Sequence, residues 1–336
     1  MRKVVVLMVV LLILAIRSVA AAPNVANTSQ MGSVLVFPDV VYQATVDPVT
    51  HAKTVNKTTI IRLVNDGPSN VDVHCEYVDK NTSGGGMEFM LKKNQAIWFD
   101  VASGGVSTFG AQHYPQEGTG EGLLVCFAVD VVLATQVKWN HLAGTATVFD
   151  FTHDTAYEYT AWAFGARAAV ADKQPVGTPG IIDLDGVQYD ACPRILQGIS
   201  QFEFAPSLCL PPDFNCNKNR LAVALCNFDV RQDYRCTQTA LKFDFWECGT
   251  KHSSETVCAD TWYGASLPYS LNGQYYEVQG TNNPAKCPGS QNVGIVGVQS
   301  RPTTVPKNSS GGTTLVGVGS VKGYILWDAP DPIIPE

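Results

Sequence analysis

Apolar and polar residues alternate along most of the chain, with the period of two that is typical of β-strands. In TIIRLVNDGPSNVDVHCEYVD, every second residue from Val71 to Tyr77 falls on one face, and polar residues fall on the other. The turn formers NDGPSN separate this run from the apolar residues 60–64. We therefore expect residues 59–79 to form a β-hairpin with one face in solvent.

The same pattern predicts further strands in both halves of the chain. Their ranges are 34–42, 96–101, 122–132, 146–151 and 157–164, followed by 220–228, 240–248, 256–264, 274–280, 292–299 and 323–327. No long amphipathic helix is predicted after residue 22. Many short strands at regular spacing predict an all-β protein of two tandem β-sandwich domains with immunoglobulin-like architecture.

Two stretches divide the chain. Residues 1–22 carry a positive start, an uninterrupted apolar run and then small residues, which is the pattern of a cleaved signal peptide. An uncleaved membrane anchor is the alternative. Residues 166–180 lack periodicity and collect proline and glycine, which is typical of a linker. We predict a first β-sandwich domain over 23–165 and a second, disulfide-braced β-sandwich domain over 181–336.

The charge balance narrows the range of partners. The chain has a formal net charge of −7, and loss of Arg2, Lys3 and Arg17 with the signal peptide would take it to −10. It contains no cluster of lysine and arginine, so nucleic acid and anionic membranes are not expected partners. The longest later apolar stretch, 123–137, is shorter than the ~18 residues that a membrane span requires. A secreted, periplasmic or cell-surface location is therefore predicted.

Ten cysteines follow the predicted signal peptide. Their spacing contains no C-x-x-C redox or C-x-x-C-H haem motif and none of the close ligand pairs of structural zinc, and an oxidising compartment favours disulfides. The predicted disulfide cysteines are Cys75, Cys126, Cys192, Cys209, Cys216, Cys226, Cys236, Cys248, Cys258 and Cys287. The pairs that we predict are Cys75–Cys126, Cys192–Cys287, Cys209–Cys216, Cys226–Cys236 and Cys248–Cys258.

The pair Cys75–Cys126 invites comparison with immunoglobulin domains, where a disulfide joins the two sheets over a tryptophan. Trp98 lies between the two cysteines, but position 124 is leucine where a tyrosine corner requires tyrosine. The immunoglobulin-like sandwich is therefore predicted as an architecture and not as a family.

The sequence predicts no catalytic residue, no metal ligand and no cofactor, because the motifs of serine hydrolases, zinc proteases and phosphate loops are absent. His141 and His153, near Asp150 and Asp154, are either metal ligands or, more commonly, solvated loop residues. Carboxylate pairs for glycoside hydrolysis cannot be recognised without their spatial separation.

Two further stretches have more than one interpretation. DLDGVQYD contains Asp183, Asp185 and Asp190 and resembles part of a calcium loop, but Asp-Gly between apolar residues is more typical of a hairpin turn. Four aromatic residues would either stack on sugars or, more commonly, contribute to the core: Trp262, Tyr263, Tyr275 and Tyr276.

The segments YDACPRIL (189–196), LCNFDVRQD (225–233) and YILWD (324–328) together resemble a group of exported, β-rich bacterial proteins with no assigned activity. The resemblance implies an exported β-rich protein and transfers no functional residue.

The low charge, the strands with open edges and the missing catalytic motifs favour a non-enzymatic structural or binding protein of the cell surface, the extracellular matrix or an appendage. Its expected partner is a protein or a glycan, or a second copy that pairs through strand edges. A secreted hydrolase acting on carbohydrate and a non-catalytic sugar-binding module are the alternatives.

Overall fold

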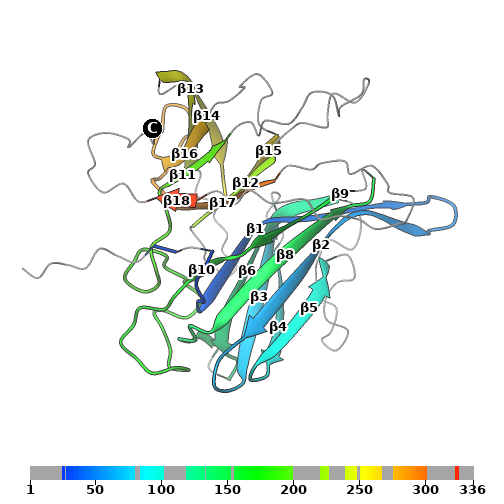
Figure 1. Ribbon diagram of the computed structural model, residues 1–336, viewed down its shortest axis with the longest axis vertical. Coiled ribbons are helices and arrows are strands. Elements are labelled where there is room, and N and C mark those ends of the chain that lie inside the picture. Colours follow the sequence, from blue (N-terminus) through cyan, green and yellow to red (C-terminus); the bar gives the residue numbers. More distant parts are fainter. Residues whose placement is uncertain are drawn as a thin grey trace, which may run out of the picture.

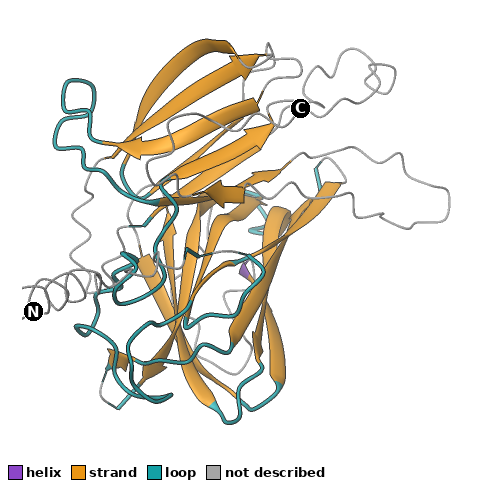
Figure 2. Ribbon diagram, turned by 60° about the vertical axis from the view of Figure 1, so that its left-hand side comes forward, coloured by secondary structure: helices purple, strands orange, loops and turns teal. Residues whose placement is uncertain are grey.

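The computed structural model confirms the all-β class (Figures 1 and 2). Its strands, β1 to β18, form antiparallel sheets. It describes residues 25–26, 28–79, 84–101, 119–132, 134–152, 155–199, 220–226, 239–247, 250–266, 275–300 and 322–324. The predicted signal peptide lies outside these residues.

The first ten strands form one ten-stranded sheet in the order β4-β3-β6-β1-β2-β8-β9, with β10 on β1, β5 on β2 and β7 on β6. Their bounds are β1 (Val34–Val46), β2 (Lys53–Asn65), β3 (Val71–Asp79), β4 (Gly84–Leu91), β5 (Gln95–Asp100), β6 (Thr119–Asp130), β7 (Thr135–Gln136), β8 (Leu142–Asp150), β9 (Thr155–Thr160) and β10 (Trp162–Phe164). The β1–β2 hairpin reaches beyond the other strands (Figure 1).

The predicted hairpin over residues 59–79 is wrong in its pairing. Alternation places the odd-numbered side chains of β3 in the core, as expected. However, β2 pairs with β1, β5 and β8, whereas β3 pairs with β4 and β6. The turn is therefore an arch between two parts of the sheet. The buried Asn65 holds it, because its amide accepts from the Gly67 N–H and donates to the carbonyls of Ser69 and Lys92.

The remaining strands form two smaller sheets, β14-β13-β16-β11-β18 and β15-β12-β17. Their bounds are β11 (Ile195–Ile199), β12 (Arg220–Leu225), β13 (Thr239–Glu247), β14 (Thr250–Ala259), β15 (Trp262–Ser266), β16 (Tyr275–Thr281), β17 (Ile295–Ser300) and β18 (Lys322–Tyr324). The irregular residues between β10 and β11 include the predicted linker, 166–180. The two-domain division remains a prediction.

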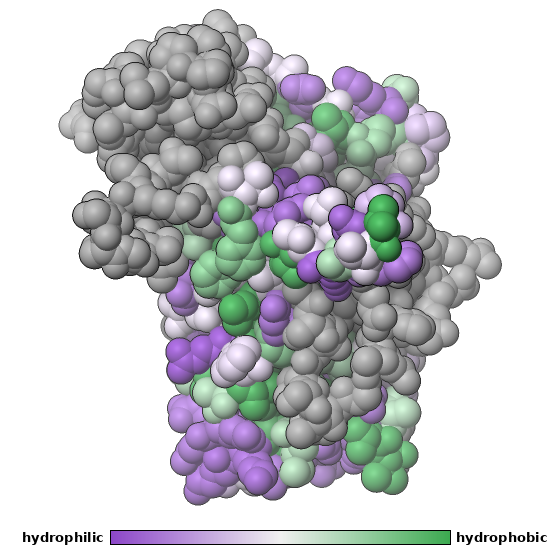
Figure 3. Space-filling view, turned by 90° about the vertical axis from the view of Figure 1, so that its right-hand side faces the viewer, coloured by the Kyte–Doolittle hydropathy of each residue, from purple (hydrophilic) through white to green (hydrophobic). Residues whose placement is uncertain are grey.

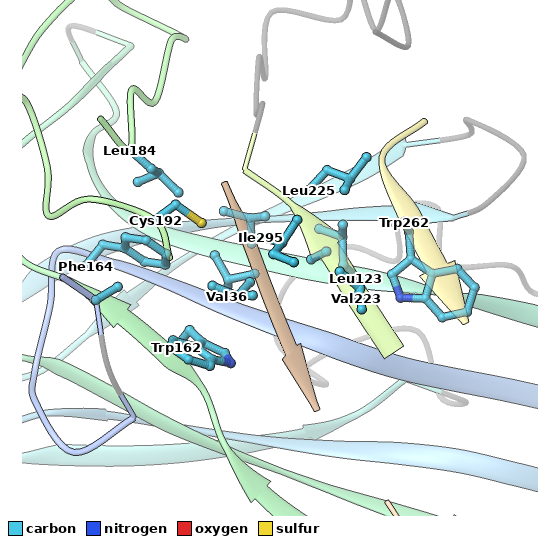
Figure 4. Close-up of a cluster of buried hydrophobic side chains, with 14 of the residues drawn as sticks. Val36, Leu123, Trp162, Phe164, Leu184, Cys192, Val223, Leu225, Trp262 and Ile295 are labelled. Carbon is cyan, nitrogen blue, oxygen red and sulfur yellow. The ribbon is translucent and has the colours of Figure 1, made fainter. Parts of the chain in front are cut away.

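The three-stranded sheet is covered on both sides. One side meets the five-stranded sheet, where the Tyr276 hydroxyl donates to Gln299 Oε1 at 2.9 Å. The other side packs on β1, β6 and β10, and Figure 4 shows side chains from all of these strands pointing toward one another. The indole of Trp162 donates to the Gly297 carbonyl at 2.9 Å, and that of Trp262 donates to the Pro38 carbonyl at 2.6 Å.

Both faces of β1 are consequently buried. Its odd-numbered residues Leu35 and Phe37 belong to the core of the ten-stranded sheet. Its even-numbered residues Val34 and Val36 belong to a second core, shared with β12 and β17. This explains why VLVFPDVVY reads as a continuous apolar run rather than as a clean alternation.

Three disulfides occur among the described residues. Cys75–Cys126 is confirmed, and it joins directly opposed residues of β3 and β6 with a Cα separation of 4.0 Å. It therefore lies within one sheet, unlike the intersheet disulfide of immunoglobulin domains, and Trp98 is exposed rather than packed on it.

The other two disulfides correct the prediction. Cys192 pairs with Cys226, and Cys258 pairs with Cys287, so the expected pairs 192–287, 226–236 and 248–258 are wrong. The predictions assumed that cysteines flanking one turn would pair. Cys192 and Cys226 are instead brought together at the start of β17, where the Ile295 N–H donates to the Pro193 carbonyl and the Cys226 N–H donates to the Gly294 carbonyl. Cys209, Cys216, Cys236 and Cys248 lie outside the described residues.

Candidate functional site: a groove over β3, β4 and β6

On three neighbouring strands, the side chains that point away from the core of the ten-stranded sheet form a grid, in which those of β3 and β4 are partly or fully exposed and those of β6 are buried. Across β4, β3 and β6, the rows are Met90–Asp72–Val129, Glu88–His74–Phe127 and Gly86–Glu76–Val125. The even positions of β3 face outward because its odd positions fill the core. The polar face predicted for residues 72–76 therefore forms the floor of a surface site.

His74 lies at the centre of this grid, between two carboxylates. Its Nδ1 lies 3.0 Å from Glu88 Oε1, and its Nε2 lies 3.0 Å from Glu76 Oε2. The ring of Phe127 packs against the imidazole, with centroids 5.2 Å apart. Both ring nitrogens are thus engaged with acidic partners.

The absence of a side chain at position 86 makes room for this cluster. A Cβ built on Gly86 would lie 2.6 Å from Glu76 Oε2 and 2.9 Å from His74 Cε1. Any other residue at this position would displace the ends of these side chains.

The two carboxylates favour the charged form of His74. Burial of the imidazole lowers its pKa, but the hydrogen bonds and charges of Glu76 and Glu88 outweigh this, and the pKa lies above its ordinary value of 6.5. Next to it, burial raises the pKa of Asp72, although Lys173 opposes the shift. Relative to their ordinary values, these shifts favour the protonated forms of His74 and Asp72.

Loops wall this grid on one side and form two adjoining hollows. One has a volume of about 340 Å³, and His74, Glu88 and Phe127 line it together with residues 134–136 and 179–180. The other has a volume of about 310 Å³, and its lining includes Asp72, Met90, Val129, residues 130–132 and Lys173. Val129 lines both hollows, so they adjoin, and we refer to the two together as the groove.

The groove combines acidic and apolar surface. Its carboxylates are Asp72, Glu88 and Asp130, with Glu76 beside them, and its basic groups are Lys173 and His74. Met90, Val131 and Val132 are among the few large apolar side chains that stay exposed in the described structure, and Val132 is 88% exposed. This mixture suits a ligand that is partly cationic and partly apolar.

A second ionic cluster lies in the interior. Asp39 is fully buried, and its Oδ1 lies 3.2 Å from Nη2 of Arg220. Nη1 of Arg220 lies 3.5 Å from Oε1 of Glu121. The Tyr157 hydroxyl donates to the Asp39 carboxylate, and the Tyr159 hydroxyl donates to its carbonyl. Asp39 raises the pKa of Arg220, and burial with the Asp39 charge raises those of both tyrosines. This cluster links the ten-stranded sheet to β12.

The aspartates that were considered as metal ligands make hydrogen bonds within the protein instead. The Asp185 carboxylate accepts from the N–H groups of Val187 and Gln188, which makes a turn. No strand flanks this turn among residues 181–190, so the predicted hairpin is wrong. The Asp190 carboxylate accepts from the Gly165 N–H. Within the described ranges, no group of three or more His, Cys, Asp or Glu residues is placed to hold a metal ion.

The histidine pair is not brought together with Asp150 in the described structure. His141 Nε2 contacts Asp172 at 3.2 Å, while Asp150 pairs with Lys57 at 2.8 Å. His153 and Asp154 lie outside the described residues.

The aromatic residues considered for sugar stacking lie mainly in the core. Trp262 and Tyr276 are buried, Tyr263 is half-buried, and the side chain of Tyr275 lies outside the description. On the face shown in Figure 3, hydrophobic residues form small separate groups among hydrophilic ones. Trp98, which is 68% exposed, is the isolated exception among the described tryptophans.

Comparisons with known proteins give no family. No family model matches the chain, and no curated protein matches it. Among solved structures, the PBSX exported protein XepA is similar over 77% of this chain and 84% of that chain, at 10% identity and a TM-score of 0.18. A score at this level supports no inference about fold or function. No described helix is long and apolar enough to cross a membrane.

Proposed function

We propose that this chain is an exported, non-enzymatic structural or binding protein of the cell surface, the extracellular matrix or an appendage, and that it binds a protein partner. It would consist of two tandem β-sandwich domains of immunoglobulin-like architecture after a cleaved signal peptide. The pattern of residues 1–22 and the disulfides support export.

The observation that carries this proposal is the groove over β3, β4 and β6. It joins exposed apolar side chains to an excess of carboxylates, and it adjoins β4, which lies at the end of the ten-stranded sheet. Protein partners commonly recognise apolar surface that is bordered by charge and by free strand edges.

The chemistry of the groove favours binding over hydrolysis. A glycosidase needs two carboxylates that face the substrate from opposite sides of the scissile bond. Here the imidazole of His74 occupies the space between Glu76 and Glu88. Cys75, which lies in the same strand, is in a disulfide and cannot act as a nucleophile.

Lysines at different distances from the groove allow a test in cells that produce the protein. Lys92, Lys93 and Lys173 border the groove, and the exposed Lys251 and Lys286 lie in the other half of the chain. Amine-reactive cross-linking followed by peptide mapping should join partner proteins mainly to the first three lysines. Retention of the protein in the cytoplasm, or partner cross-links confined to Lys251 and Lys286, would contradict the proposal.

A further inference from the structure

We propose that the outer edge of β4, beside the groove, accepts an extended, cationic segment of a partner protein as an additional β-strand. This inference rests on the proposed function and names the chemistry of the partner. It combines three properties of β4: its position in the sheet, its row of outward-facing side chains and the charge around it.

The position of β4 leaves one side of its backbone available. In the described structure its strand partner is β3, with a continuous register from Val71 opposite Leu91 to Val78 opposite Gly84. An edge strand presents a row of N–H and C=O groups that another extended chain can pair with. Such pairing supplies affinity through the main chain and specificity through alternate side chains.

The outward-facing side chains of β4 define the complementary pattern. In a strand added beside β4, three alternate residues would lie next to Gly86, Glu88 and Met90, because directly opposed side chains lie about 4.5–5.5 Å apart. Glu88 favours lysine or arginine, and Met90 favours an aliphatic residue. Gly86 has no side chain, and Glu76 and His74 fill the space above it, so an aromatic residue there would cover the glycine backbone and pack beside these side chains.

The surroundings add to the selectivity for a cation. Asp72, Glu76 and Asp130 lie in or beside the same groove as Glu88, against Lys173 and His74. The His74 contact to Glu88 uses Oε1. A strand that carried a carboxylate at the central position would lie against Glu88 and be repelled.

The other edge of the same sheet provides an internal control. The strand β9 also ends the sheet, and its Glu158 is exposed. Glu158 lies opposite Thr147 of β8, and neither residue lines either hollow of the groove. An edge strand and a glutamate are therefore present there without the groove.

The test uses short fluorescent peptides and the full-length mature, oxidised protein. Each peptide alternates threonine with three test residues, namely phenylalanine, lysine and valine. Both orders are made, so that parallel and antiparallel addition to β4 are each tested. Comparison peptides carry glutamate in place of lysine, or N-methyl groups on alternate amides that remove the strand-pairing donors. Binding is followed by fluorescence anisotropy at low ionic strength and at 150 mM salt.

The lysine peptide is expected to bind about tenfold more tightly than the glutamate peptide, and the N-methylated peptide is expected not to bind. Glu88→Gln should weaken binding about 2- to 5-fold, and Glu158→Gln should leave it unchanged. Met90→Thr provides a second variant on β4, and thermal melts confirm that all three variants fold.

Three outcomes would overturn this inference. Equal binding of the N-methylated peptide, or an equal effect of Glu158→Gln, would show attraction by charge without strand addition. A concentration-dependent dimer that dissociates in Glu88→Gln would assign the edge to a second copy of this chain. If no peptide binds while cross-linked partners still map to the groove, the strand-addition inference fails and the proposed function stands.

Discussion

The two ionic clusters have similar chemistry and different surroundings. Arg220 and Asp39 meet where Asp39 is fully buried, and two tyrosine hydroxyls complete the bonds of Asp39. His74 meets Glu76 and Glu88 on an outward-facing strand surface, in a groove that remains open. The two cationic side chains are almost equally exposed, at 23% for Arg220 and 22% for His74, whereas Asp39 is fully buried and Glu88 is 52% exposed. The comparison teaches that burial of the carboxylate, rather than charge alone, decides whether such a cluster holds the fold together or stays available to a partner.

The largest effect is expected at the buried cluster. Arg220→Met removes the cation and leaves Asp39 buried without its charged partner. Loss of one member of a buried pair costs about 3–5 kcal/mol. Urea unfolding should show this loss in the free energy of unfolding, and the double variant with Asp39→Asn should recover at least half of it. A loss below about 1 kcal/mol for the single variant would show that the pair is solvated like a surface pair.

The next effect distinguishes buried from exposed tryptophan. Trp262→Phe removes the indole N–H that donates to the Pro38 carbonyl at 2.6 Å and leaves that carbonyl without its donor. The expected loss is about 1–3 kcal/mol in the free energy of unfolding. Trp98→Phe is the matched control and should change stability by less than about 0.5 kcal/mol. Equal losses for the two variants would contradict the arrangement of the two sheets.

The groove cluster should give a smaller effect that depends on pH. Because the folded-state pKa of His74 is raised, its stabilising contribution is complete below the ordinary value of 6.5 and is lost as pH rises through the folded-state pKa. His74→Gln should therefore cost about 1 kcal/mol in acid and progressively less as the solution becomes alkaline. Thermal melts across this range would test it, and a difference that grew with pH would contradict the assignment.

Gly86→Ala should have the smallest effect on stability. Its Cβ meets the mobile ends of Glu76 and His74, which can move aside at a cost of less than about 1 kcal/mol. The pH dependence attributed to His74 should become weaker, because its bond to Glu76 is displaced. An unchanged pH profile in this variant would show that Glu88 alone holds the imidazole.

The sequence predicted much of this fold at the level of single strands. Period-two alternation located β3, β8 and β13, and for β3 it assigned the buried face, because a strand with one face in solvent carries that information locally. The pairing of strands was harder to predict from the sequence. Alternation around the NDGPSN turn is the same for a hairpin and for an arch, and it was the side chain of Asn65, bonded to residues 69 and 92, that distinguished the two.

The floor of the groove was visible in the sequence, and its walls were not. Alternation predicted that His74 lies on the solvent-facing side of a strand, but it predicted no site there. The walls come from residues 130–132, 134–136, 173 and 179–180, which are distant in the sequence and meet only after β6, β7 and the irregular segment have folded. The disulfide pairs failed for the same reason, because Cys192–Cys226 and Cys258–Cys287 depend on tertiary packing and not on single turns.

The burial of β1 on both faces has a consequence for the order of folding. Val34 and Val36 pack on strands that include β17, which begins at Ile295, so an early strand of the chain finds part of its core near the end. Contacts of such long sequence separation form slowly. Until β12 and β17 have packed on them, the apolar face of β1 and β6 would remain exposed to solvent. A chain truncated before residue 295 would expose this face to other chains. The last third of the sequence thus completes the first sheet.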